Sequence, residues 1–304
     1  MKRAPSEDTA QLKTERRNPA TDLLDTWPSI EMARAINAED ARIAGAVKKA
    51  LPQIARAIDA IAAALSDGGR LIYVGTGTSG RLAALDAAEC PPTFNTDPKM
   101  VQYVIAGGVK ALGRAVEANE DSRQAGRADL AKRKPTNHDV VVGITASGRT
   151  PYTVAAVAFA RSCGAVTVGI TCNPHSPLEK AVDIPIVVEV GPEVVAGSTR
   201  MKAGTSQKMV LNMISTGAMA RLGYVFGNLM VNLRQKNSKL LERAIRILQQ
   251  AAGLDHENSL KALNKAGGNV AVAIIMTRRK ASRTEAERLL QKSRKHIRAA
   301  LGEV

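Results

Sequence analysis

The sequence predicts an α/β protein: a doubly wound, mainly parallel five-stranded sheet followed by an all-helical C-terminal subdomain. Three observations support this fold class. Short β-branched runs recur five times between residues 70 and 190. Most of the segments between them are long enough for a crossover helix, and from about residue 236 onward only helical patterns occur. Alternation of strands and helices of this kind is typical of a parallel sheet covered on both faces.

The five runs predict the strands of the sheet. Each is nearly continuous in apolar residues, as expected for a strand that is buried on both sides. The first three connections between runs leave room for a helix, and the fourth, residues 172–183, is short. The predicted strands are Arg70–Gly75, Met100–Ala106, Asp139–Thr145, Ala165–Thr171 and Ile184–Val190.

Helical segments flank the predicted strands. Ala38–Leu65 has a helical pattern, and Pro52 is expected to start a second helix because proline inside a helix removes a backbone hydrogen bond. Residues Met1–Pro28 are polar and irregular. Lys202–Leu222 is apolar on most faces, which predicts a helix buried in the core or in an interface.

The C-terminal quarter of the chain predicts four helices. They are Ser238–Ala252, Glu257–Ala266, Asn269–Arg279 and a last one from Thr284, which Ser282 and Glu285 would open with a capping box. We therefore predict three parts. Residues 1–60 supply an N-terminal segment and helices that pack on the core, residues 61–230 form the sheet domain, and residues 231–304 form the helical subdomain.

The chain is strongly basic, and its charge is unevenly distributed. It has 304 residues and a formal net charge of +15. Residues 231–304 hold 16 Lys and Arg against 6 Asp and Glu, so most of the surplus lies in the predicted helical subdomain. A basic surface is typical of nucleic-acid binding, but aromatic residues make up only 3% of the chain. With so few stacking side chains, we expect no nucleic-acid partner.

The spacing of the cysteine, histidine and apolar residues excludes several other classes of protein. Cys90, Cys163 and Cys172 form no CxxC pair, which argues against a disulfide framework and favours a reducing compartment, the cytoplasm. The four histidines are scattered, so no metal site is expected. The apolar runs are far shorter than the ~18 residues that span a bilayer, so we expect no membrane association.

The first strand is followed by a glycine-rich loop. Gly75–Gly80 matches GxGxxG between a strand and a helix, the context of a dinucleotide fingerprint. That fingerprint also needs an acidic residue at the end of the second strand, where this chain has Gly107 and Gly108. A P-loop is excluded as well, because no Gly-Lys-Ser/Thr follows. Dinucleotide and P-loop binding are therefore disfavoured.

A related loop follows the third strand, and both loops open a helix. Backbone N–H groups, hydroxyls and two helix N-termini would converge at one edge of the sheet, which suits a phosphorylated, polyhydroxylated small molecule. Ordinary helix caps are the alternative interpretation. A third cluster, Gly197–Thr205, precedes the apolar helix and could add Lys202. The first loop spans residues 75–81, and the second spans residues 145–151.

Several carboxyl groups are candidates for proton transfer. Glu89 is predicted to close the helix after the first loop, in surroundings poor in charge. A carboxyl group in such a place can act as an acid or base if burial raises its pKa. Glu117, Glu120 and Asp121 lie together after the second strand. The residue pattern alone does not choose among these three, and each carboxylate could equally be solvated.

Long blocks of this sequence resemble the N-acetylmuramic acid 6-phosphate etherases, a family of sugar-isomerase (SIS) domain enzymes. The resemblance covers nearly the whole chain from Thr14 into the helical tail. Glucokinase regulatory protein is related but has two SIS domains, whereas this chain has one. The matching blocks are GTGTSGRLAALDAAECPPTF, AVEANEDSR, VVVGITASGRTPY, GITCNP, GSTRMKAGTSQKMVLNMISTG and VFGNLMVN.

The resemblance implies an activity and a catalytic pair. The family cleaves the D-lactyl ether of N-acetylmuramic acid 6-phosphate to N-acetylglucosamine 6-phosphate and D-lactate, in amino sugar recycling from the cell wall. It implies no cofactor and a homodimer. Its two catalytic carboxylates match Glu89 and Glu120. The resemblance to SIS sugar-phosphate sites also implies binding residues, to which the context of the third cluster adds Lys202: Thr78, Ser79 and Gly80 in the first loop, and Thr145, Ser147, Gly148 and Thr150 in the second. We expect Glu89 to be the main acid/base group, protonating the departing lactate, and Glu120 to assist in ring opening or proton relay.

Two other functions are compatible with the same loops. An aldose–ketose isomerase of sugar phosphates would use them with a carboxylate at C1 and C2. A non-catalytic sensor would bind a sugar phosphate and regulate a partner, although this chain lacks the second SIS copy of its nearest example. A DNA-binding regulator would need a helix-turn-helix module ahead of the sheet, for which the first 37 residues are too short and irregular.

Overall fold

The computed structural model describes residues 12–116, 119–233 and 238–303. The chain forms two compact units. The first contains the described residues up to Ala87 together with Lys99–Ile214, and the second contains Ala88–Pro98 together with the described residues from Ser215 onward. The predicted division at residues 60 and 230 stays a prediction.

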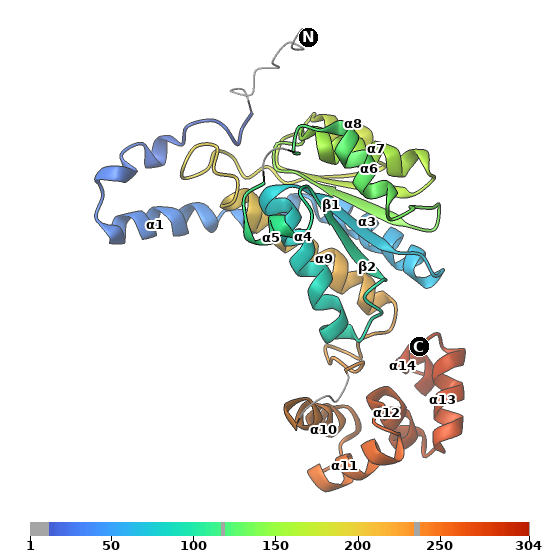
Figure 1. Ribbon diagram of the computed structural model, residues 1–304. Helices are drawn as coiled ribbons and strands as arrows, with labels where there is room; N and C mark the ends of the chain where they lie inside the picture. Colours follow the sequence, from blue (N-terminus) through green and yellow to red (C-terminus); the bar gives the residue numbers. More distant parts are fainter. Residues whose placement is uncertain (1–11, 117–118, 234–237, 304) are drawn as a thin grey trace. The chain divides into compact units, whose positions relative to one another are not determined.

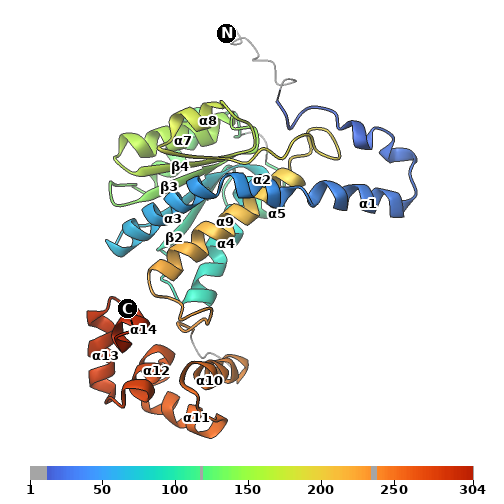
Figure 2. The same ribbon diagram turned by 180° about the vertical axis from the view of Figure 1, so that it is seen from behind.

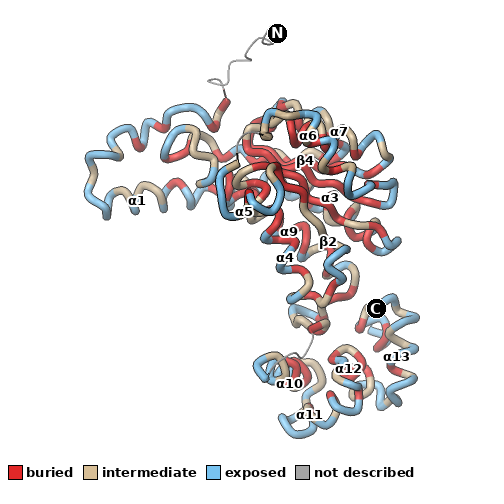
Figure 3. Tube along the Cα trace, viewed as in Figure 1, coloured by how far each residue is buried: buried red, intermediate tan, exposed pale blue. Residues whose placement is uncertain are grey.

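The first unit is built on a parallel sheet of five strands, as predicted (Figure 1). The five apolar runs became its strands, and their order in the sheet is β2-β1-β3-β4-β5. Figure 3 shows the strands as a mostly buried layer, in agreement with the near-continuous apolar character of the runs. The strands are β1 (Leu71–Gly75), β2 (Val101–Ile105), β3 (Val140–Ile144), β4 (Val166–Thr171) and β5 (Ile184–Val187).

The strand order reverses direction between β1 and β3. These strands are neighbours in the sheet, and Gly75 at the end of β1 pairs with Ile144 at the end of β3. The loops that follow them, residues 76–80 and 145–150, therefore leave the same edge of the sheet side by side. Such a switch point at the carboxyl ends of parallel strands is where open α/β sheets bind ligands.

Helices cover the sheet on both faces. α7 contacts β1, β3 and β4, and α3 contacts β1, β3 and β5; Figures 1 and 2 show these layers on opposite sides of the strands. The helices here are α1 (Ser29–Asp40), α2 (Ile43–Lys49), α3 (Leu51–Ser66), α4 (Gly77–Phe94), α5 (Lys110–Gly113), α6 (Arg123–Ala131), α7 (Pro151–Ser162), α8 (Pro177–Ala181) and α9 (Lys202–Arg221).

The N-terminal helices differ in part from the prediction. Pro52 does open a helix, as α3 begins at Leu51. The first helix starts at Ser29, nine residues before the predicted Ala38, and two short 3-10 turns, Pro19–Thr21 and Leu24–Thr26, precede it. In α1 only Glu39 is buried. With no continuous apolar face, this helix has little hydrophobic periodicity by which a sequence reveals a helix.

The second unit contains a helical core. Its helices are α10 (Ser238–Ala252), α11 (His256–Lys265), α12 (Val270–Arg279), α13 (Arg283–Lys292) and α14 (Ile297–Leu301). The prediction of one last helix from Thr284 is wrong, because Arg294 and Lys295 have positive φ angles of 50° and 71° that interrupt it. Within the described ranges, no helix is long and apolar enough to span a bilayer.

The capping box predicted before α13 forms only in part. The Ser282 hydroxyl accepts a hydrogen bond from the backbone N–H of Glu285, which satisfies one donor of the first helical turn. The Glu285 carboxylate instead accepts two hydrogen bonds from Arg288, one turn further on.

Candidate functional site

The first loop turns sharply from β1 into α4. Gly77 has a φ of +49°, a conformation that L side chains rarely adopt. At Gly80, a Cβ atom would lie 2.6 Å from the Ile105 side chain and 2.9 Å from the Gly75 carbonyl oxygen, so only glycine fits. The glycines of the GxGxxG pattern thus serve a tight strand-to-helix turn. Thr78 and Ser79 occupy the first turn of α4.

The second loop gathers three hydroxyl groups at the start of α7. Thr145 Oγ1 lies 2.7 Å from Thr150 Oγ1 and 3.3 Å from Ser147 Oγ. The backbone N–H of Arg149 donates to Ser147 Oγ over 3.1 Å. Gly148 has a φ of +70°, and a Cβ atom there would lie 2.3 Å from Ser176 Oγ. The structure therefore brings the predicted hydroxyls of this loop together.

The first loop packs against the start of α9. A Cβ atom at Gly204 would lie 3.3 Å from Thr78 Cγ2. The Ser79 hydroxyl donates to Gln207 Oε1 over 2.9 Å, and both side chains are buried. The predicted third cluster is therefore adjacent to the first loop.

Lys202 has a different environment from the one predicted. Its ammonium group is buried and forms an ion pair with Glu39 of α1. Arg42 donates to the other oxygen of Glu39, at 2.9 Å. The ammonium group is thus engaged within the protein, and the structure gives Lys202 a role in holding α1 to the start of α9.

A second buried carboxylate caps α9. The backbone N–H groups of Lys202 and Ala203 donate to the two oxygens of Glu193, each over 2.9 Å. A carboxylate at a helix N-terminus is favoured by the helix dipole. Burial nevertheless raises the pKa of Glu193, against the effect of these two donors. Glu193 therefore fixes the helix end that borders the first loop.

Glu120 faces the first loop. Its Oε1 atom would lie 3.3 Å from a Cβ atom at Gly77, and its backbone carbonyl accepts a hydrogen bond of 3.1 Å from the N–H of Tyr152 in α7. The segment after β2 therefore carries this half-buried carboxylate toward the switch point. Asp121 is exposed, and Glu117 lies outside the described residues.

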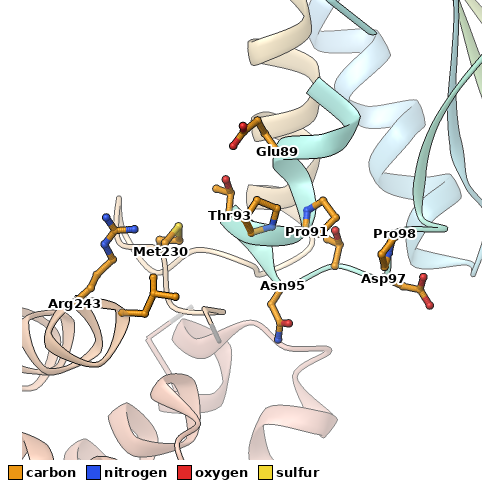
Figure 4. A pocket seen from close by; sticks show the side chains of 11 residues that line it. Glu89, Pro91, Thr93, Asn95, Asp97, Pro98, Met230 and Arg243 are labelled. Atoms are coloured by element: carbon orange, nitrogen blue, oxygen red, sulfur yellow. The ribbon is translucent and has the colours of Figure 1, made fainter. Parts of the chain in front are cut away.

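Glu89 is exposed on α4. The helix continues for five residues beyond it to Phe94, so the prediction that Glu89 closes the helix is wrong. Within the second unit, Glu89 borders a pocket of about 680 Å³ that Thr93, Met230 and Arg243 also line (Figure 4).

Among the described residues, Cys172 is not a further nucleophilic centre. Burial raises the pKa of Cys172 to about 12, so this residue is a neutral thiol at pH 7. Across residues 12–116, 119–233 and 238–303, no three His, Cys, Asp or Glu side chains gather where they could hold a metal ion.

Sequence reasoning missed three residues at this site. Gln207, Glu193 and Glu39 are buried polar side chains that contact the predicted cluster from elsewhere in the chain. Gln207 carried no local signal, because Ser206, Lys208 and Asn212 of the same helix are polar as well. The partners of Glu39 and Glu193 depend on tertiary contacts.

Three family models match the chain. The model of the glucokinase regulatory protein N-terminal SIS domain matches residues 53–161, and the SIS domain model matches residues 128–216. The model of the C-terminal lid domain of glucokinase regulatory protein matches residues 227–271. Together they cover the sheet and part of the helical subdomain.

Curated relatives match nearly the full chain. An N-acetylmuramic acid 6-phosphate etherase of Edwardsiella ictaluri is 50% identical over 96% of this chain and 97% of its own length. One from Vibrio parahaemolyticus is 51% identical over 97% of this chain and 98% of its own. One from Symbiobacterium thermophilum is 56% identical over 87% of this chain and 88% of its own length. At this identity and coverage, the chain belongs to the N-acetylmuramic acid 6-phosphate etherase family.

Proposed function

We propose that this chain cleaves the D-lactyl ether of N-acetylmuramic acid 6-phosphate, giving N-acetylglucosamine 6-phosphate and D-lactate. The observation that supports this most strongly is the arrangement at the switch point. Two hydroxyl-bearing loops open α4 and α7 there, and the Glu120 carboxylate faces the first of them. Such a site offers donors for a sugar phosphate together with a group that can accept or deliver a proton.

The two loops supply the binding groups. Helix N-termini and clustered hydroxyls favour a phosphate or a sugar oxygen without a metal ion. Lys202 supports the site through its pairing with Glu39 at the start of α9, while its ammonium group stays engaged. The proposed binding residues are Thr78, Ser79, Gly80, Thr145, Ser147, Gly148 and Thr150.

Two carboxyl groups suffice for the chemistry. In the open-chain sugar, the aldehyde at C1 acidifies the proton at C2. A base removes that proton, lactate leaves from C3 as an acid protonates the ether oxygen, and water then adds at C3 of the unsaturated aldehyde. Glu89 protonates the departing lactate, and Glu120 assists in ring opening or proton relay. Each such group is commonly worth ~10²–10⁴ in rate.

The position of Glu89 favours a homodimer. It borders a pocket of the second unit that no residue of the two loops lines. We therefore propose that the loops and Glu120 of one protomer act together with Glu89 of the partner subunit. The three cysteines are free thiols, which supports the proposal that the reaction takes place in the reducing cytoplasm.

Mixed variants test the shared site. Glu89→Gln and Glu120→Gln, each inactive alone, are unfolded and refolded together. If Glu89 acts across the dimer, each mixed dimer has one intact site, and a statistical mixture recovers about a quarter of the wild-type rate. No recovery, with mixed dimers verified by mass, would show that both carboxylates act within one chain.

The activity itself is tested by incubating the protein with N-acetylmuramic acid 6-phosphate and assaying D-lactate with a stereospecific dehydrogenase. The etherase produces D-lactate in equal amount to N-acetylglucosamine 6-phosphate. An isomerase would consume other sugar phosphates without releasing lactate, and a sensor would bind the substrate unchanged. Either result would refute the proposal.

A further inference from the structure

Gln207 has an unusual environment for a buried amide. Only 1% of the residue is exposed, and it lies on α9 against the first loop. Its Oε1 atom accepts the hydrogen bond from the Ser79 hydroxyl, but its Nε2 atom is buried and has no hydrogen-bond partner. A buried N–H group without an acceptor is among the costlier defects of a protein interior.

In the present arrangement, the Ser79 hydroxyl also cannot donate a hydrogen bond to an anionic ligand. While its proton is donated to Gln207 Oε1, the Ser79 oxygen can only accept a hydrogen bond from a ligand. Phosphate and carbonyl oxygens of a sugar phosphate are themselves acceptors. Ser79 can serve such an oxygen only if its proton is released from Gln207.

We propose that Gln207 is a positioning residue for the substrate: in the ligand-bound state its amide is reversed, Nε2 donates to Ser79 Oγ, and the Ser79 proton points to an acceptor oxygen of the sugar phosphate. Rotation about the last side-chain torsion exchanges Oε1 with Nε2, the Ser79 hydroxyl proton turns toward the ligand, and no other heavy atom has to move. Oε1 then takes the unpartnered place, and an unsatisfied carbonyl oxygen is better tolerated than an unsatisfied N–H group. This inference rests on the proposed function.

The test measures binding of N-acetylglucosamine 6-phosphate by calorimetry, so that it does not depend on turnover. Gln207→Met keeps the length of the side chain and removes both hydrogen bonds. We expect it to weaken binding fivefold or more, whereas in a Ser79→Ala background the same change costs less than twofold. Gln207→Glu, whose ionised carboxylate can only accept, should weaken binding more than Gln207→Met does. Gln124→Met, on the exposed side of α6, is the matched control.

The inference is overturned if Gln207→Met costs less than fivefold, or if its cost persists without the Ser79 hydroxyl. It is also overturned if Gln207→Glu binds as tightly as wild type, because Gln207 would then act only as an acceptor. If Gln207→Met does not fold, Gln207→Asn replaces it, because this side chain is one methylene shorter and moves the amide away from Ser79. Gln207→Asn must then weaken binding in the presence of the Ser79 hydroxyl and cost little in the Ser79→Ala background. A wild-type protein that binds the sugar phosphate but releases no D-lactate would refute the proposed function and leave this test intact.

Discussion

Breaking the buried ion pair of Lys202 and Glu39 should destabilise the first unit. Lys202 is 1% exposed and Glu39 is 4% exposed. Removing one partner of a buried pair typically costs ~3–5 kcal/mol, because the other charge stays buried without its counter-charge. Arg42 still donates to Glu39 after Lys202→Met, so we expect the lower end of that range, about 3 kcal/mol. At an m-value of about 3 kcal/mol/M, the urea midpoint falls by roughly 1 M.

The double variant Glu39→Leu with Lys202→Met separates charge from packing. Replacing both charges by apolar side chains is often neutral, so the double variant should be more stable than Lys202→Met alone. The assay is urea unfolding followed by the fluorescence of Trp27, the single tryptophan of the chain, which precedes α1 by two residues. Lys49→Met, at an exposed position, is the control. The reasoning is refuted if Lys202→Met changes stability by less than about 1 kcal/mol yet abolishes sugar-phosphate binding.

Three further changes have defined outcomes. Gly204→Ala presses a methyl group on Thr78 and should weaken sugar-phosphate binding several-fold by calorimetry, whereas Gly45→Ala, with open space around it, should raise the free energy of unfolding by ~0.5–1 kcal/mol. Burial opposes ionisation of Asp139, but the hydrogen bonds and charge of Arg70 and the backbone N–H of Thr136 together outweigh it and lower the pKa of Asp139. The ionised Asp139 therefore contributes its full stabilisation above the unfolded pKa of about 3.9. This stabilisation is lost as the pH falls through the lower pKa of the folded state. Asp139→Asn should remove the loss of stability in that pH range when the free energy of unfolding is measured against pH. Glu120→Gln should slow D-lactate release by ~10²-fold or more while calorimetry shows sugar-phosphate binding retained, and an unchanged rate would remove Glu120 from the mechanism.

The sheet could be predicted from the sequence because its signal is local. Each strand is a short apolar run at the expected place. The central strands β1 and β3 are buried throughout, and the edge strands β2 and β5 are buried in part. The order of the strands is not a local property, but the two related loops, each following a parallel strand and opening a helix, predicted that they meet at one edge of the sheet. The register of Gly75 with Ile144 explains why they meet.

The missed parts of the fold depend on weak or interrupted patterns. α1 has one buried residue among twelve, so it lacks the periodicity that identifies a helix. The break between α13 and α14 rests on left-handed conformations at Arg294 and Lys295, residues that ordinarily favour a helix.

The candidate site was only partly predictable for a similar reason. The hydroxyls of the two loops are close in sequence to the glycines that reveal them. The sequence predicts Lys202 as a donor to the ligand because nothing near it reveals its partner Glu39, which lies 163 residues away. The hydrogen bond between Ser79 and Gln207 likewise spans 128 residues. Pairings over such separations arise from the tertiary fold.

The measurement that tests the proposed activity most directly is the cleavage of N-acetylmuramic acid 6-phosphate in water enriched in ¹⁸O. Elimination followed by addition of water places the label on C3 of N-acetylglucosamine 6-phosphate and leaves D-lactate unlabelled. Mass spectrometry of both products reads the outcome. Label in the lactate, or no release of D-lactate by a folded protein, would contradict the account.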